Sequence, residues 1–153
     1  MPILALVDQE ATERLGRAVA ARLAAGEAVC LYGPLGAGKS TLARALVRAL
    51  TSEDEEVPSP TFTLVQGYDG PRFPIAHFDL YRLRSPDEAY EIGLDEALDA
   101  GAALIEWPER LEGALPADRL DIHLEPGQSE RARIARIEGV GAWKGRDGFD
   151  EFG

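Results

Sequence analysis

Apolar positions along this chain repeat with two different periods, one typical of helices and one typical of strands. From Glu10 to Ala25 they recur at helical spacing, and Gly26 supplies a stop signal. Residues 39–50 show the same helical spacing. Two continuous apolar runs, residues 27–32 and residues 102–107, are typical of strands covered on both faces of a sheet. The pattern predicts alternating helices and buried strands.

The other segments fit the same picture. Residues 2–7 predict a short strand, and residues 61–68 and 73–81 predict two strands around the turn "DGPR". Residues 85–101 have a serine cap, a proline in the first turn and a closing glycine, which together predict one helix. Alternating positions in residues 119–126 and 131–139 predict a late β-hairpin.

These elements define the expected fold class and domain organisation. We expect an α/β protein with a central mixed β-sheet flanked by helices. The chain has no internal repeat and no linker-like segment, so we expect one domain over residues 1–153. The C-terminal segment from about residue 140 is rich in glycine, and we expect it to form a loose tail.

The net charge of the chain limits the kinds of molecule that it can bind directly. The chain has 16 Lys and Arg residues against 27 Asp and Glu residues, a net charge of −11. Tight binding to nucleic acid or to an anionic membrane needs clustered cations. The composition disfavours direct nucleic-acid binding, although a local basic patch or a basic partner protein could reverse this. No apolar run approaches the roughly 20 residues of a membrane span, and we expect a cytoplasmic protein without membrane contact.

The segment "GPLGAGKS", Gly33 to Ser40, matches the phosphate-loop pattern G-x-x-x-x-G-K-[ST] between a predicted strand and a predicted helix. Glycines allow backbone amides to turn inward around an anion. Lys39 can bridge the β- and γ-phosphates of a nucleotide, and the Ser40 hydroxyl can ligate magnesium. Small GTPases normally read guanine with an Asn-Lys-x-Asp motif, and this chain contains no asparagine. The sequence therefore predicts binding of ATP with Mg²⁺.

A phosphate loop needs a carboxylate near magnesium, normally at the end of a neighbouring apolar strand. Glu106 ends the run "AALIE", and Asp79 ends the less uniform run "IAHFD". The more apolar strand favours Glu106 as a magnesium ligand or a water-positioning group. Asp79 could take the same role or hold the metal through a water, so the residues leave the two acids unranked.

Three further residues are candidates for the site or for the sheet around it. Thr61 in "SPTF" carries a hydroxyl suited to a segment that senses the γ-phosphate and magnesium, or it simply opens a strand after Pro60. His77 is flanked by two apolar residues, which favours a structural role. Trp107 is either an aromatic residue at the sheet edge or a cover for the site.

Taken together, the segments "LYGPLGAGKST", "SPTFTLV", "HFDLYRL" and "IEWPER" resemble the TsaE family of small bacterial P-loop ATPases, and "ATERLG" resembles the opening helix of that family. The resemblance runs from about Ala11 to about Arg136. It implies a role in the threonylcarbamoyl modification of the adenosine beside the tRNA anticodon. In that family the ATPase acts on the TsaB–TsaD pair, is weakly active alone and supports turnover of the pair, so tRNA would be reached only through partners.

The resemblance also implies roles for single residues. Ser40 stands where family members often have threonine, which keeps the hydroxyl ligand. Glu106 matches the second magnesium-associated acid, and Trp107 matches the tryptophan of a second switch-like segment. Asp79 and Thr61 match catalytic and switch-like positions. The expected catalytic residues are Lys39, Asp79, Glu106 and Thr61, the metal ligands Ser40, Glu106 and Asp79, and the nucleotide contacts Gly33, Gly36, Ala37, Gly38, Lys39, Ser40, Thr41, Gln9, Thr12, Trp107 and Arg133.

Two other functions are compatible with the same loop. A small-molecule kinase needs an acceptor pocket and usually an arginine-bearing lid, and the region "RLEGALPADR", residues 110–119, is short and poor in suitable residues. A non-hydrolysing nucleotide-binding adaptor needs only the loop. In both alternatives Glu106 would have no role in water attack.

Overall fold

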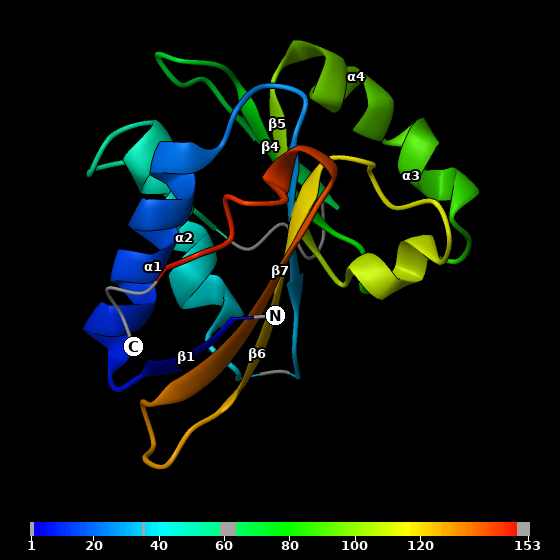
Figure 1. Ribbon diagram of the computed structural model, residues 1–153. Helices are drawn as coiled ribbons and strands as arrows, with labels where there is room; N and C mark the ends of the chain where they lie inside the picture. The colour runs from blue at the N-terminus through cyan, green and yellow to red at the C-terminus, as the bar shows by residue number, and fades with distance from the viewer. Residues whose placement is uncertain (1, 35, 59–63, 150–153) are drawn as a thin grey trace.

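A computed structural model describes residues 2–34, 36–58 and 64–149 of the chain (Figure 1). Its strands form one seven-stranded sheet in the order β1-β7-β6-β2-β5-β4-β3. Strand β2 pairs in parallel with β5 and β6, and β5 pairs in parallel with β4, whereas the outer pairs are antiparallel. The strands are β1 (Ile3–Leu6), β2 (Ala28–Tyr32), β3 (Val65–Tyr68), β4 (Ile75–Asp79), β5 (Ala102–Glu106), β6 (Arg119–Pro126) and β7 (Arg133–Val140).

Helices cover both faces of this sheet. Helices α1 and α2 lie on one face, and the shorter α3 and α4 lie on the other (Figure 1). The mixed sheet flanked by helices confirms the predicted fold class. The helices are α1 (Gln9–Arg22), α2 (Lys39–Leu50), α3 (Asp87–Glu91) and α4 (Leu94–Ala100), with the 3₁₀ turns η1 (Pro108–Leu111) and η2 (Gly141–Trp143).

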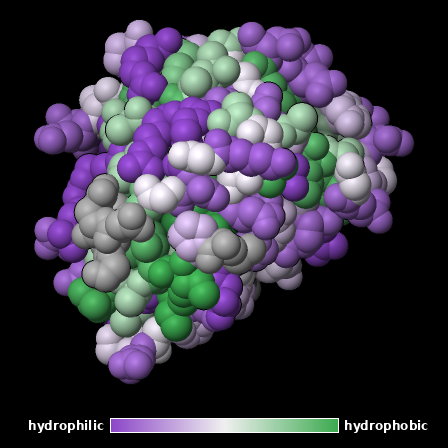
Figure 2. Space-filling model, viewed as in Figure 1, coloured by the Kyte–Doolittle hydropathy of each residue, from purple (hydrophilic) through white to green (hydrophobic). Residues whose placement is uncertain are grey.

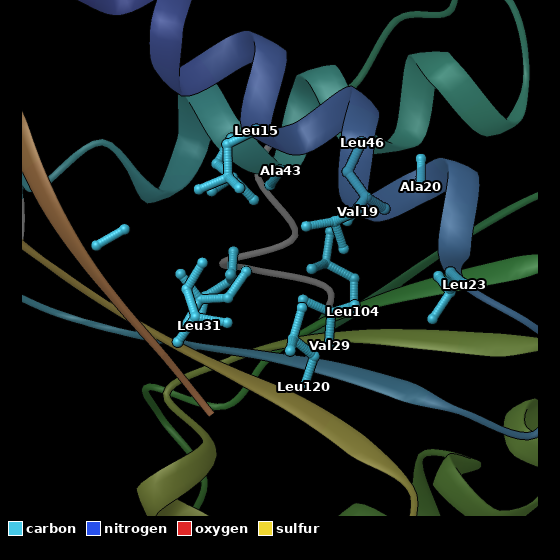
Figure 3. Packing of buried hydrophobic residues seen from close by; sticks show 14 of the residues in the cluster. Leu15, Val19, Ala20, Leu23, Val29, Leu31, Ala43, Leu46, Leu104 and Leu120 are labelled. Atoms are coloured by element: carbon cyan, nitrogen blue, oxygen red, sulfur yellow. The ribbon is translucent and has the colours of Figure 1, made fainter. Parts of the chain in front are cut away.

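The larger core lies between the sheet and the α1–α2 pair. Leu15 and Val19 of α1 and Leu46 of α2 point toward Val29 and Leu104 of the central strands (Figure 3). Their burial supplies the hydrophobic free energy that holds α1 and α2 against this face of the sheet.

The two helices of this layer approach closely at one glycine. A Cβ atom at Gly16 would lie 2.8 Å from the carbonyl oxygen of Leu42 and 3.0 Å from the Cβ of Ala45. Only a residue without a side chain permits this separation of the helix backbones. The contact therefore helps to fix the position of α2, the helix that follows the glycine loop.

The single helix predicted over residues 85–101 is wrong. Two short helices, α3 and α4, occupy this segment, and Gly93 separates them with a φ of 94°. A residue in the left-handed region cannot continue a right-handed helix. Gly93 therefore ends the first helix and turns the chain into the second.

The loose tail expected from about residue 140 is also wrong as far as Phe149. Trp143 and Phe149 are fully buried. The Arg22 guanidinium donates hydrogen bonds to the carbonyl oxygens of Arg146 and Gly148 and lies 4.1 Å from the centre of the Phe149 ring. The glycine content of this segment predicts a loose tail, but the burial of Trp143 and Phe149 holds it against the core.

Most of the surface seen in Figure 2 is hydrophilic. An apolar area lies near β1, where Ile3 and Val7 are exposed. Among the described residues, no helix is both long enough and apolar enough to cross a membrane.

Replacing Phe149 by alanine tests the packed tail. Because the side chain is fully buried, we expect Phe149→Ala to lower the free energy of unfolding by about 3–5 kcal/mol. Lys144→Ala, at an exposed position of the same segment, is the control and should change it by less than about 0.5 kcal/mol. Equal stabilities of the two variants in urea denaturation would mean that the tail is loose after all.

Candidate nucleotide and magnesium site

The glycine loop connects the buried strand β2 to the N-terminus of α2. Three of its glycines have backbone angles in the left-handed region, with φ of 146° at Gly33, 81° at Gly36 and 95° at Gly38. Gly38 directly precedes α2 as its N-cap residue, and a glycine has no side chain with which to cap the first amides of the helix. Uncapped amides and the helix dipole favour an anion at this point. The loop therefore has the local geometry that a phosphate requires.

Lys39, the first residue of α2, carries a buried amine next to this loop. Its side chain is only 5% exposed, and its Nζ atom has no hydrogen-bond partner among the described residues. Burial lowers the pKa of the Lys39 amine, and the nearby carboxylates of Glu106, Glu109 and Asp79 oppose this shift. A buried ammonium without hydrogen bonds is costly. Phosphate oxygens at the loop would satisfy it, so the residues present fit a bound nucleotide.

The Lys39 amine faces an aromatic ring. The Lys39 Nζ lies 3.9 Å from the centre of the Trp107 ring, a cation–π contact. Trp107 follows β5 directly and has a φ of 58°, which is rare for a bulky residue. Its ring also packs against Tyr81, with ring centres 4.9 Å apart. Of the two interpretations of Trp107, this position fits a cover over the site.

Both predicted acids lie at the same edge of the sheet. Asp79 ends β4 and Glu106 ends β5, and the two residues are register partners in the parallel pair. Each is only 6% exposed. The Asp79 Oδ1 accepts a hydrogen bond from the backbone amide of Tyr81 at 3.1 Å. The parallel pairing thus brings the two carboxylates to the side of the sheet where the glycine loop begins.

His77 joins these acids, which the sequence analysis did not predict. Its Nε2 lies 2.6 Å from the Glu106 Oε2, and both side chains are buried. The available signal was the spacing of two residues from Asp79, because side chains two apart on a strand share a face. Nothing along the sequence indicated that Glu106 would be the partner.

A pocket beside these groups contains the predicted magnesium ligands Ser40 and Glu106. It is also lined by Ala43, Arg44, Val57, Pro58 and His77. A hydroxyl and a carboxylate are oxygen ligands of the kind that Mg²⁺ prefers. The described residues hold no group of three or more acidic, His or Cys side chains that could bind a metal alone. Mg²⁺ usually keeps waters and phosphate oxygens as further ligands.

The remaining predicted nucleotide contacts meet on another side of the loop. A second pocket is lined by Gln9, Thr12, Gly38, Thr41, Arg131 and Arg133. Arg133 donates a hydrogen bond to the carbonyl oxygen of Gly36 at 3.0 Å, and Arg131 donates to the Oε1 of Gln9 at 2.9 Å. Hence β7 and the start of α1 enclose the loop from outside. Thr61, the predicted switch-like residue, lies outside the described residues.

The sheet, the loop and the following helix define a P-loop α/β fold. The family model "Threonylcarbamoyl adenosine biosynthesis protein TsaE" matches residues 6–134. The chain belongs to the TsaE family, as the sequence motifs predicted.

Individual relatives agree with this assignment. A Rickettsia bellii protein is 42% identical over 120 residues, 78% of this chain and 83% of that protein. A Bacillus subtilis protein is 36% identical over 127 residues, 82% of this chain and 78% of that one. Both carry the name tRNA threonylcarbamoyladenosine biosynthesis protein TsaE. The crystal structure of Bacillus subtilis YdiB superposes with a TM-score of 0.73 at 29% identity, covering 92% of this chain and 86% of that one.

Gly33→Ala tests the geometry of the loop. A Cβ atom at this position would lie 2.6 Å from the carbonyl oxygen of Leu124, and the φ of 146° is unfavourable for alanine. We expect the free energy of unfolding to fall by about 1–3 kcal/mol. Gly113→Ala is a matched control, because nothing lies within 4 Å of its added Cβ. Unchanged melting of both variants would contradict this loop conformation.

Proposed function

We propose that the chain is a magnesium-dependent ATPase that supports the threonylcarbamoyl modification of the adenosine next to the tRNA anticodon. It acts on a TsaB–TsaD complex and keeps that complex turning over. The observation that carries the ATP-binding part is the buried Lys39 ammonium, which has no hydrogen-bond partner in the part of the chain that the structure describes and lies next to a glycine loop at a helix N-terminus. Membership of the TsaE family supports the pathway and the partners.

Each part of the site has a role in this function. The amides of the glycine loop and Lys39 bind the phosphates of ATP, and Ser40 with Glu106 or Asp79 holds the magnesium ion. The ion would neutralise charge that develops on the transferred phosphoryl group. Glu106 also orients the attacking water, because its carboxylate faces the pocket that Ser40 shares. Gln9 and Thr12 lie beside the loop, where they are available to the nucleoside.

The charge of the chain favours a protein partner over direct tRNA binding. A net charge of −11 repels a polyphosphate backbone. ATP hydrolysis in such a protein changes the state of the partner complex, and the reaction on tRNA belongs to that complex. Nucleotide binding and partner binding are therefore expected to depend on each other.

Two variants test the site and the function together. Lys39→Ala removes the charge at the phosphates, and we expect ATP affinity to fall about 10- to 100-fold, as for the loss of a charge-assisted hydrogen bond. Glu106→Ala keeps the loop and Lys39, so we expect ATP binding to persist while hydrolysis falls about 100-fold or more. Affinity is measured by calorimetry and hydrolysis by phosphate release, with and without a purified TsaB–TsaD pair.

The outcomes separate the proposal from its alternatives. Stimulation of hydrolysis by the TsaB–TsaD pair, lost in Glu106→Ala, supports a partner-coupled ATPase. Transfer of phosphate to a small acceptor would indicate a kinase. ATP binding without hydrolysis by the parental chain, alone or with the pair, would indicate an adaptor. If Lys39→Ala hydrolyses ATP at the parental rate, the assigned site is wrong.

A further inference from the structure

The side chains of His77 and Glu106 contact each other although the two residues are not directly opposite in the sheet. His77 lies opposite Leu104 in the register of β4 and β5, and Glu106 lies opposite Asp79. The two side chains are therefore diagonal neighbours on one face of the sheet. Nevertheless the His77 Nε2 reaches the Glu106 Oε2 at 2.6 Å. Such a short distance indicates a strong, charge-assisted hydrogen bond between two buried groups.

The donor in this bond follows from the chemistry of the two groups. An ionised carboxylate only accepts hydrogen bonds, so toward an ionised Glu106 the imidazole Nε2 is the donor. The Nδ1 atom of His77 is buried and has no partner among the described residues.

The bond occupies one of the two carboxylate oxygens of Glu106. Both His77 and Glu106 line the pocket that Ser40 shares. Because the imidazole holds Oε2, the other carboxylate oxygen, Oε1, is the one that can bind a ligand in that pocket. A carboxylate free to rotate would alternate between its neighbours, which include the Lys39 ammonium whose charge acts on it. Fixing one oxygen therefore selects one orientation of the other.

We propose that His77 is a positioning residue that orients the Glu106 carboxylate toward the magnesium ion and the attacking water. This inference rests on the proposed ATPase function. His77 then orients a catalytic group, whereas its apolar neighbours in the sequence favour a structural role. A residue that hydrogen-bonds to a metal ligand orients that ligand. Loss of such a residue typically lowers metal affinity or activity 10- to 100-fold.

Two amide substitutions distinguish positioning from filling space. In His77→Gln the side-chain nitrogen takes the place of Nε2 and can still donate to Glu106. In His77→Asn it takes the place of Nδ1 and cannot reach. We expect His77→Asn to lower kcat for ATP hydrolysis about 10- to 100-fold, with the KM for ATP within about 2-fold of the parental value. His77→Gln should restore most of kcat. Equal activities of the two variants would overturn the proposal.

A double-mutant cycle separates this inference from the proposed function. If His77 acts through Glu106, then His77→Asn in the Glu106→Ala background should cause no further loss of kcat. A full additional loss would show an effect that does not pass through Glu106. If Glu106→Ala itself hydrolyses ATP at the parental rate, the proposed function fails, whatever the His77 variants do.

A nucleotide-free measurement tests the bond itself. The chain has two histidines, His77 and His123, so a His123→Gln variant assigns the imidazole ¹⁵N signals. We expect His77 to carry its proton on Nε2 in the free protein, and we expect the Nε2 signal to shift in Glu106→Ala. A proton on Nδ1 alone, or an Nε2 signal that does not change in Glu106→Ala, would overturn the assigned hydrogen bond.

Discussion

The parallel pairing of β2, β5 and β4 is the constraint on which the candidate site depends. Parallel strands end at the same edge of a sheet. Strand β2 therefore runs into the glycine loop at the edge where β4 ends in Asp79 and β5 ends in Glu106. Ligands of open α/β sheets bind outside the carboxyl ends of the strands for this reason. A different strand order would leave the loop without its acids.

This edge concentrates ionisable groups that are costly to bury. Lys39, His77, Asp79 and Glu106 all have side chains almost inaccessible to solvent. Three contacts reduce the free-energy cost of burying these groups. His77 and Glu106 share a hydrogen bond, Asp79 accepts one from the Tyr81 amide, and the Trp107 ring faces Lys39. Buried charges of this kind are weak evidence for stability. They fit the proposed chemistry at the site, and the apolar core between the sheet and the α1–α2 pair offsets their effect on folding.

Local signals made much of this arrangement predictable. Helix α2 begins and ends at Lys39 and Leu50, as its apolar spacing predicts, because the glycine loop marks its start. The two strand-ending acids were predicted because apolar runs end at them. The break at Gly93 was missed, since an isolated glycine inside a helical pattern is compatible with an unbroken helix.

Long-range packing was beyond sequence reasoning. Phe149 is buried in the larger core, and Arg22, far away in the chain, packs over its ring. The His77–Glu106 bond joins residues 29 positions apart through the register of two strands. The contact of Lys39 with Trp107 depends on an unusual backbone angle that no local motif signals.

The most direct test of the central claim is a crystal structure with Mg²⁺ and a non-hydrolysable ATP analogue. The account predicts phosphates inside the loop from Gly33 to Thr41, with the Lys39 Nζ on phosphate oxygens and no longer over the Trp107 ring. It also predicts Mg²⁺ beside Ser40, on the side of the sheet that carries Asp79 and Glu106. Nucleotide bound elsewhere, or Lys39 still on Trp107 with the loop empty, would contradict it.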